Sequence, residues 1–416
     1  MSETNIKKIL LSLSAEERRK LFPDFDSAMF AKLLKMSDKE ILAAIKRRPS
    51  RTEHCTPQTT NQVKENQCST RWFDKEISGL DKEGAAKLKE LREQLANPAT
   101  RHQANKKLAR YLERLENMRI SVPDMFRNKV HPRELYRHLV SFCRANDIPE
   151  EIVVRVIPAL IEYIETGHMR PVIFVGEKGC GKTTAVRLLI KEALHLPIVV
   201  IKVPQTVGSH GMTGYSDTWQ SADAGLIAKG RIREDNIVVV YLLDEVDKVS
   251  HDRNSASVDD ELLSITDESC CDVYDNYLET TLVGLEHCPI FMTANDLDKV
   301  SPMLADRCTV IHFPNANATR IKSISHKYAN KKLSGDLYSM IKFDYDLMDK
   351  HIDHLVSCDV TSLRKHQQMI EAVLENALNI AFTQETDEVV AVTEDMFIEA
   401  ENAVLGSNKR RVGFEY

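Results

Sequence analysis

The spacing of hydrophobic residues predicts helices over the first half of the chain. Between residues 72 and 168 apolar residues recur at helical spacing on two faces: Leu88, Leu91 and Leu95 on one, and Leu108, Tyr111, Leu112 and Leu115 on the other. The turn-forming "NPAT" between them predicts two antiparallel amphipathic helices. Two further helices are expected before Thr166, the second within the strongly apolar "PEEIVVRVIPALIEYIE".

Short, continuous apolar runs replace the helical spacing from about residue 169. They are "PVIFV" (171–175), "PIVVIKV" (197–203), "IVVVYLL" (237–243), "PIFMTA" (289–294) and "TVIHF" (309–313). Strands that are apolar on both faces and alternate with helices are typical of a parallel sheet covered by helices. We therefore expect an α/β domain over residues 169–316 with a five-stranded parallel sheet.

The flanking segments divide into helical and polar stretches. Helical spacing returns after the sheet and predicts a helical domain over 317–405, followed by a basic tail over 406–416. Residues 1–48 indicate short amphipathic helices, with Ser37 as one N-cap, and 49–71 form a polar linker. Residues 72–168 would then be a helical region that leads into the α/β domain.

Composition narrows the class of protein. The 416 residues are 43% hydrophobic and 28% charged, which is typical of a globular protein, and the net charge of −6 gives no overall reason to expect nucleic acid or anionic lipid. No apolar run approaches the length of a membrane span, and the N-terminus lacks a secretory cleavage pattern. Nine scattered cysteines without a C-x-x-C pair favour reduced thiols. These features predict a cytoplasmic protein without a membrane partner.

The strongest motif is "GEKGCGKT", which fits G-x-x-x-x-G-K-[ST] and lies between a predicted strand and a predicted helix. Its glycines let backbone N–H groups surround phosphate oxygens, and the helix N-terminus adds partial positive charge. Lys182 is expected to reach the β- and γ-phosphates and Thr183 to bind Mg²⁺. Cys180 predicts sensitivity to thiol alkylation. The candidate nucleotide contacts are Gly176, Glu177, Lys178, Gly179, Cys180, Gly181, Lys182, Thr183 and Thr184.

A second motif, "IVVVYLLDEVDK", ends a buried strand in two carboxylates. Because parallel strands end at one edge of the sheet, Asp244 is expected to hold the Mg²⁺ shell and Glu245 to polarise the attacking water. A GTPase is disfavoured, since the strand end lacks the D-x-x-G glycine and "TANDLDK" is not the N-K-x-D guanine reader.

Two later residues complete the candidate catalytic set. Asn295 ends the strand "PIFMTAND" and would orient water, while Arg307 in "SPMLADRC" would supply positive charge to a γ-phosphate. In isolation, a turn asparagine and a surface salt bridge would explain them better. Their order and spacing after the two nucleotide motifs favour the catalytic interpretation.

These motifs resemble those of AAA+ ATPases and, more closely, the ATPase module of Lon proteases. "YLLDEVDKV", "LLSITDESCCDVYDNYLE" and "FMTANDLDKVSPMLADRCTVIHFP" are similar to segments of that module. The stretch "GYSDTWQSADAG" is similar to its pore loop. The resemblance covers about residues 170–416, and residues 1 to about 130 match nothing.

The resemblance implies an AAA+ P-loop domain with a C-terminal helical lid, assembled as a homo-oligomeric ring, expected to be a hexamer. It implies ATP and Mg²⁺ as cofactors, with Asp244 and Glu245 at metal and water, Asn295 as a γ-phosphate sensor and Arg307 acting on a neighbouring subunit. Trp219 would face the central channel and grip a substrate chain. The alternative is that Trp219 folds back and anchors its loop to the core.

Two departures from the family pattern matter. The family places a lid arginine where this chain has Thr361, so Arg364, one helical turn further on, is the candidate substitute, unless it is only a surface charge. Lon continues into a Ser–Lys protease domain after a segment that "RVGFEY" resembles. Since no segment offers a nucleophile-serine motif, we do not expect this chain to be a peptidase by itself.

Three functions follow as hypotheses. The first is an ATP-hydrolysing ring motor that threads or remodels a macromolecule, with protein as the favoured substrate or partner. The second is an ATP-switched, DNA-associated module of a mobile-element or defence system, in which "KRRPSR" (46–51) and "NKRR" (408–411) would touch phosphates, although solvated basic ends explain them as well. The third is a scaffold that binds ATP without turnover, which the presence of Glu245 and Arg307 disfavours.

Overall fold

A computed structural model describes residues 71–128, 130–206, 211–215, 222–248, 256–267, 273–383 and 388–406. The chain divides into two units, residues 1–68 and 69–416, and every described residue belongs to the second. The predicted helices of residues 1–48, nearly all of the linker, the tip of the loop that carries Trp219 and nearly all of the basic tail lie outside the described residues.

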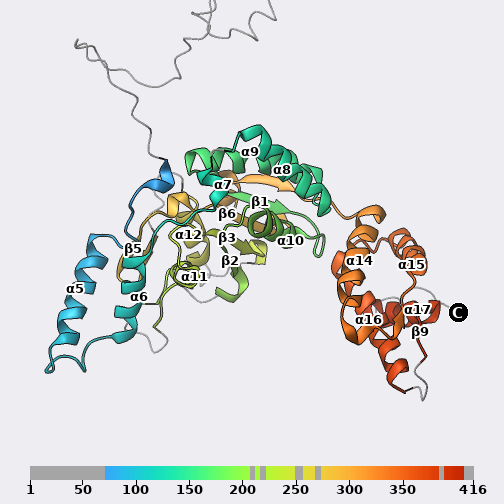
Figure 1. The fold of residues 1–416 in the computed structure, drawn as a ribbon. Helices are drawn as coiled ribbons and strands as arrows, with labels where there is room; N and C mark the ends of the chain where they lie inside the picture. Colours follow the sequence, from blue (N-terminus) through green and yellow to red (C-terminus); the bar gives the residue numbers. More distant parts are fainter. Residues whose placement is uncertain are drawn as a thin grey trace, which may run out of the picture. The chain divides into compact units, whose positions relative to one another are not determined.

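The predicted five-stranded parallel sheet is confirmed. Its strands are β1 (Val172–Val175), β2 (Ile198–Lys202), β3 (Val240–Asp244), β6 (Ile290–Ala294) and β7 (Thr309–His312), in the order β2-β3-β6-β1-β7 (Figure 1). The three inner strands are buried along their length except at Asp244, whereas the edge strands β2 and β7 are partly exposed. Continuous burial of the inner strands explains why their sequences do not alternate with polar residues.

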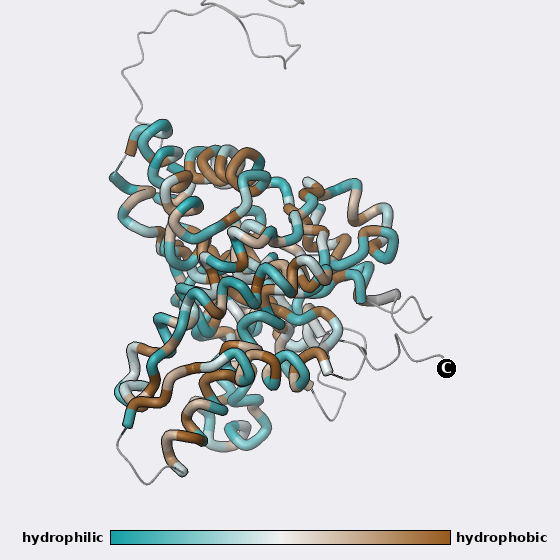
Figure 2. The backbone as a smooth tube through the Cα atoms, turned by 90° about the vertical axis from the view of Figure 1, so that its right-hand side faces the viewer, coloured by the Kyte–Doolittle hydropathy of each residue, from teal (hydrophilic) through white to brown (hydrophobic). Residues whose placement is uncertain are grey.

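Helices pack against the sheet and connect its strands. Figure 2 shows hydrophobic and hydrophilic stretches alternating along the backbone, as expected for helices with one buried face. The Tyr163 hydroxyl of α9 donates to the His287 carbonyl at 2.9 Å, which joins α9 to the segment that leads into β6. The helices around the sheet are α8 (Pro132–Ala145), α9 (Glu150–Thr166), α10 (Lys182–Arg187, continued as a π-helix over Leu188–Ala193), α11 (Leu226–Glu234), α12 (Ala256–Ile265) and α13 (Pro302–Arg307).

A helical hairpin precedes these elements, at the position where two antiparallel helices were predicted. It consists of α5 (Lys82–Ala96) and α6 (Lys106–Asn117), and the short α7 (Asp124–Arg127) follows. Asp81 and Asn105 cap the two helices, accepting bonds from Gly84 N at 2.7 Å and Leu108 N at 3.1 Å. α5 also contacts a β-hairpin that was not predicted, β4 (Val273–Asp275) and β5 (Thr280–Leu282).

The C-terminal helical lid is confirmed. Its helices are α14 (Ala318–Leu333), α15 (Tyr345–Ser357), α16 (Leu363–Thr383) and α17 (Glu394–Leu405), and they bury a hydrophobic core separate from that of the sheet domain. A two-stranded parallel sheet, β8 (Ile341–Lys342) with β9 (Val390–Ala391), was not predicted. Among the described residues, no helix combines the length and the apolar character that crossing a membrane requires.

Candidate functional site

The glycine-rich loop joins the end of β1 to the start of α10. Gly179 and Gly181 have φ values of 85° and 103°, in the region that favours glycine. At Gly176 a side chain is excluded by space, because a Cβ there would lie 2.5 Å from the Phe313 carbonyl oxygen. The sequence G-x-x-G-x-G is therefore required by backbone conformation and by the close approach of β7.

Lys182, the first residue of α10, lies inside this loop. Its side chain is buried, and Nζ donates to the carbonyl oxygens of Gly176 at 2.6 Å and Glu177 at 2.9 Å. Burial lowers the pKa of Lys182, while nearby groups including Asp244 and Asp247 oppose that shift. The loop thus holds a cation at its centre with backbone carbonyls as its partners, which phosphate oxygens can replace.

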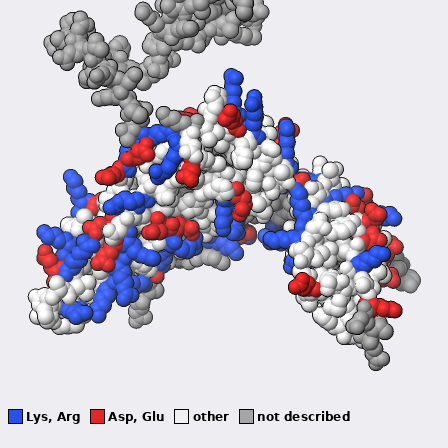
Figure 3. Space-filling view, viewed as in Figure 1, with Lys and Arg blue, Asp and Glu red and all other residues white. Residues whose placement is uncertain are grey.

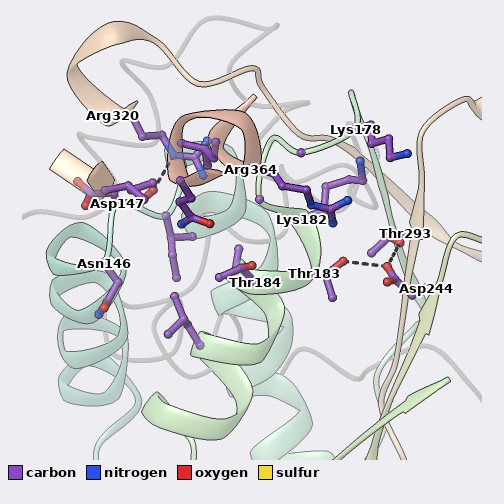
Figure 4. A pocket seen from close by; sticks show the side chains of 18 of the residues that line it. Asn146, Asp147, Lys178, Lys182, Thr183, Thr184, Asp244, Thr293, Arg320 and Arg364 are labelled. Carbon is purple, nitrogen blue, oxygen red and sulfur yellow. Dashed lines mark hydrogen bonds between the residues drawn. The ribbon is translucent and has the colours of Figure 1, made fainter. Parts of the chain in front are cut away.

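The two carboxylates lie at the carboxyl end of β3, as predicted. Asp244 Oδ1 accepts bonds from Thr183 Oγ1 at 2.8 Å and from Thr293 Oγ1 at 2.6 Å (Figure 4). Glu245 has φ of 63°, a strained value for a residue with a side chain, and its N–H donates to Thr293 Oγ1 at 3.0 Å. The two neighbouring carboxylates therefore have different surroundings. Asp244 is bonded to two hydroxyl groups, whereas Glu245 follows it at a strained backbone turn.

The oxygen atoms around Asp244 fit a magnesium ion. Mg²⁺ prefers oxygen ligands and keeps several waters, so one carboxylate and one hydroxyl from the protein, with the nucleotide phosphates, are sufficient. Thr183 and Asp244 supply such a pair. Across the described part of the chain, no group of three or more His, Cys, Asp and Glu residues could form a metal site made of protein ligands alone.

Asn295 lies between the loop and the carboxylate segment. Its Oδ1 accepts from Lys182 Nζ at 3.3 Å and its Nδ2 donates to Asp247 Oδ2 at 3.3 Å. Glu245 is one-third exposed and its carboxylate forms an ion pair with Lys248 Nζ at 2.6 Å. Asn295 is therefore bonded directly to Lys182, so movement of the lysine would change this bond. The Glu245 side chain is accessible to water.

A cavity of about 280 Å³ unites most of the predicted residues. It is lined by Lys178, Gly179, Gly181, Lys182, Thr183, Thr184, Asp244, Glu245, Asn295 and Arg364 among the residues predicted from the sequence, whereas Gly176, Glu177 and Cys180 do not line it. The lining residues that the sequence did not indicate include Asn146, Asp147, Ile148, Thr293, Arg320, Ile324, Lys327, Leu363 and Gln367. They come from the α8–α9 turn, the tip of β6 and two lid helices, so no local motif connects them.

The lid closes over the loop at the start of α16. Leu363 N donates to the Gly179 carbonyl at 3.0 Å, and a Cβ on Gly179 would lie only 2.2 Å from Ser362 Oγ. Arg364 lines the cavity from this helix, so the structure places the candidate lid cation beside the nucleotide loop. Thr361 lies at a neighbouring surface hollow that Gly179 and Arg364 share.

Arg307 lies near the amino-terminal ends of the strands, whereas the glycine-rich loop lies at their carboxyl ends. It precedes Thr309, which pairs with Val172 at the start of β1, whereas the loop follows the end of β1. Its guanidinium donates to the Leu263 carbonyl and lies 3.5 Å from Asp267 Oδ2, both at the end of α12. Arg307 therefore does not line the cavity of its own chain, and an action on a neighbouring subunit stays a prediction.

Burial limits the predicted reactivity of Cys180. Its side chain is 2% exposed and its Sγ lies 3.9 Å from Lys182 Nζ. An alkylating reagent would reach the thiol only when the loop opens. Alkylation is therefore expected to be slow in the closed loop.

The loop that carries Trp219 is described only at its base, and Trp219 lies outside the described residues. Tyr215 N donates to the Asp223 carbonyl at 3.0 Å, so the chain leaves and returns at one point. Asp275 accepts from Gly225 N at 2.8 Å, and burial raises its pKa to about 6. The buried Glu261 of α12 accepts from Thr213 N at 3.1 Å. Two buried carboxylates thus anchor both sides of the loop base.

Comparison with known proteins agrees with this geometry. Residues 172–315 match the model of the ATPase family associated with various cellular activities (AAA). A Lon protease of Syntrophus aciditrophicus (strain SB) is 30% identical over 195 residues, which are 44% of this chain and 24% of that protein. A Lon protease of Koribacter versatilis (strain Ellin345) is 25% identical over 284 residues, which are 65% of this chain and 34% of that protein.

Among solved structures, one of the S. cerevisiae Hsp104:casein complex in its extended conformation matches with a TM-score of 0.49 at 14% identity, covering 65% of this chain and 52% of that chain. The matched part of this chain spans between about a quarter and a third of the two Lon proteases. The likeness to Lon is therefore to the ATPase region and not to the whole of those proteins.

Proposed function

Because the chain carries an AAA ATPase domain with distant homology to the ATPase region of Lon proteases, we propose that it hydrolyses ATP and uses that energy to thread or remodel a protein substrate. The observation that carries the proposal is the single cavity in which the phosphate loop, Asp244, Glu245 and Asn295 converge. A scaffold that only binds ATP would need neither a strained, water-accessible glutamate nor the asparagine beside it.

Each residue of the cavity has a role in the proposed reaction. The loop N–H groups and Lys182 bind the phosphate chain, and Thr183 and Asp244 would hold Mg²⁺, which supplies charge neutralisation at the phosphates. Glu245 accepts a proton from the attacking water. Its side chain is partly exposed to solvent, and the backbone turn at this residue gives it surroundings different from those of Asp244. Asn295 orients that water and responds to the γ-phosphate through Lys182.

Assembly would complete the site. A γ-phosphate carries concentrated negative charge in the transition state, and arginine supplied by a second subunit stabilises it in many nucleotide hydrolases. Bonds at the end of α12 hold Arg307 away from the cavity of its own chain. Its guanidinium would instead act on the nucleotide of a neighbouring subunit. We therefore propose a homo-oligomeric ring, with six subunits as the expected number.

The protein substrate is proposed from the loop of residues 211–225. Its anchored base would present Trp219 to the centre of the ring, where an aromatic side chain can hold extended chains of varied sequence by apolar contact. The competing proposal, binding to DNA, has less support. The net charge of −6 gives no overall reason to expect nucleic acid, although Figure 3 shows Lys and Arg outnumbering Asp and Glu over the helical hairpin.

We expect Trp219→Ala to separate ATP hydrolysis from substrate remodelling. Basal ATPase activity should change less than twofold, because Trp219 lies in a loop whose base is bonded independently of it. Unfolding of a fluorescent substrate protein, followed by loss of its fluorescence, should fall to background. Trp219→Phe, which keeps an aromatic ring, serves as the matched control and should retain most of the remodelling.

Two results would contradict this expectation. If Trp219→Ala lowers the melting temperature by several degrees and reduces ATPase activity in parallel, the tryptophan is an anchor for the loop. If DNA stimulates the wild-type ATPase and unfolded protein does not, the substrate is nucleic acid. Capture of bound proteins on Glu245→Gln loaded with ATP would then identify the natural substrate.

A further inference from the structure

The lid carries a second arginine in the nucleotide cavity, on a helix other than that of Arg364. Arg320 lies in the first turn of α14 and lines the cavity together with Lys182 and Thr183 (Figure 4). Its Nε donates to the Asp147 carbonyl at 2.8 Å, and its guanidinium lies 5.3 Å from the centre of the Phe313 ring. The side chain is thus held in place on two sides, by the α8–α9 turn and by the end of β7.

One nitrogen of this guanidinium has no partner. Nη1 of Arg320 is buried and makes no hydrogen bond within the described part of the chain. A buried donor on a charged group without an acceptor costs free energy, and such groups in folded proteins normally have a protein, water or ligand partner. Burial lowers the pKa of Arg320, but guanidinium groups start so high that it stays charged at neutral pH.

The other terminal nitrogen of the Arg320 guanidinium, Nη2, is close to the glycine-rich loop. A Cβ built on Gly181 would lie 3.3 Å from Arg320 Nη2, so the guanidinium approaches the backbone that surrounds the phosphates. The carboxylates of Asp147 and Glu151 interact with it electrostatically, but neither forms an ion pair with it in the segments that the structure describes. The position therefore combines a fixed positive charge, a missing acceptor and contact with the loop.

Bonds from the same face of α14 hold this helix at the α8–α9 turn. Ser323 Oγ donates to Asp147 Oδ2 at 2.9 Å, and Lys327 Nζ forms an ion pair with the same carboxylate at 2.5 Å. Residues 320, 323 and 327 are three and four apart, so they share one face of the helix. Asp147 accepts all three bonds from a left-handed backbone conformation with φ of 54°. These bonds fix the position of α14 and therefore limit the positions that the Arg320 side chain can occupy.

We propose that Arg320 is a nucleotide-binding residue, whose guanidinium donates to the phosphate chain of ATP through Nη2, the nitrogen that lies beside the Gly181 backbone. This rests on the proposed function, because it assumes that the cavity binds ATP. It assigns the lid cation to α14, in a chain that has threonine at position 361, just before α16. Arg364 then borders the cavity without being the main lid contact.

The proposal predicts weaker nucleotide binding by Arg320→Ala. Because a hydrogen bond to a charged group contributes about 1.5–3 kcal/mol, the Kd for ATP and the Kd for ADP should both rise about 10- to 100-fold. Equilibrium titration with fluorescent ATP and ADP analogues measures both constants, and thermal unfolding checks the fold. Arg320→Lys keeps a positive charge and should recover a large part of the affinity. Lys331→Ala, an exposed cation at the far end of α14, is the matched control and should not change either Kd.

The alternative role is a lid contact alone. The substitution Ser323→Ala removes one of the bonds to Asp147 and leaves Arg320 and the residues that line the cavity intact. If it weakens ATP binding as much as Arg320→Ala, or if Arg320→Lys recovers nothing, the proposal is overturned. It is also overturned if Arg364→Ala weakens binding more than Arg320→Ala does.

The proposed function has its own readout in the same titration. Lys182→Ala should abolish binding of the ATP analogue. If Lys182→Ala binds normally, the cavity is not an ATP site and the proposed function fails. If Lys182→Ala loses binding and Arg320→Ala keeps it, only the assignment of Arg320 fails.

Discussion

Glu245→Gln should abolish ATP turnover while leaving ATP binding close to wild type. Glutamine has nearly the same size as glutamate but cannot accept a proton from water, and a well-placed general base contributes about 10²- to 10⁴-fold to a rate. The phosphate loop and Asp244 are unchanged by the substitution, so the affinity should stay within about threefold. Phosphate release under saturating ATP and equilibrium binding of an ATP analogue measure the two quantities.

The structure supplies a control for this substitution. Glu162→Gln on α9 makes the same chemical change at an exposed position away from the cavity, and should leave turnover unchanged. Activity of Glu245→Gln above a tenth of wild type would mean that another group accepts the proton. A parallel loss of ATP binding would mean that Glu245 shapes the cavity and does not act on water.

Arg307→Ala is expected to reduce turnover by about 10³- to 10⁵-fold, the range found for arginines that act on a γ-phosphate. ATP affinity should be nearly unchanged, because Arg307 does not line the cavity of its own chain. Turnover of the wild type should rise more than linearly with protein concentration where the ring is forming. Arg137→Ala on α8, which removes an arginine at an exposed position, serves as the control.

Mixing two inactive proteins tests directly whether Arg307 acts between subunits. Arg307→Ala retains Glu245, and Glu245→Gln retains Arg307, so a mixed ring contains interfaces with both groups intact. Recovery of ATPase activity on mixing is the expected result. If neither mixing nor subunit exchange restores activity, Arg307 supports its own chain through α12, and the proposed interface site is wrong.

The strands could be predicted because burial on both faces leaves a direct trace in the sequence. "PIFMTA" contains β6, buried at every position, and "IVVVYLL" overlaps β3, although the strand begins three residues later, at Val240. The β4–β5 hairpin and the β8–β9 pair were missed because their strands have only two or three residues. Such short segments give no periodicity to detect.

The site residues that could be predicted from the sequence are those that belong to a motif following a predicted strand. Asp244 ends β3, Asn295 follows β6, and Lys182 follows β1 after the glycine-rich loop, so the sheet brings them together once their strands are found. Asp147 and Arg320 could not be predicted in this way. They lie 173 residues apart and meet through packing of the lid against the α8–α9 turn. A local pattern carries no information about such a contact.

The base of the loop at residues 211–225 is bonded to two elements of the sheet domain. Among the described residues, Thr213 bonds to Glu261 of α12, Gly225 bonds to Asp275 of β4, and Tyr215 pairs with Asp223. The same α12 accepts the bond from Arg307, at the Leu263 carbonyl. A shift of α12 would therefore move the loop base and Arg307 together.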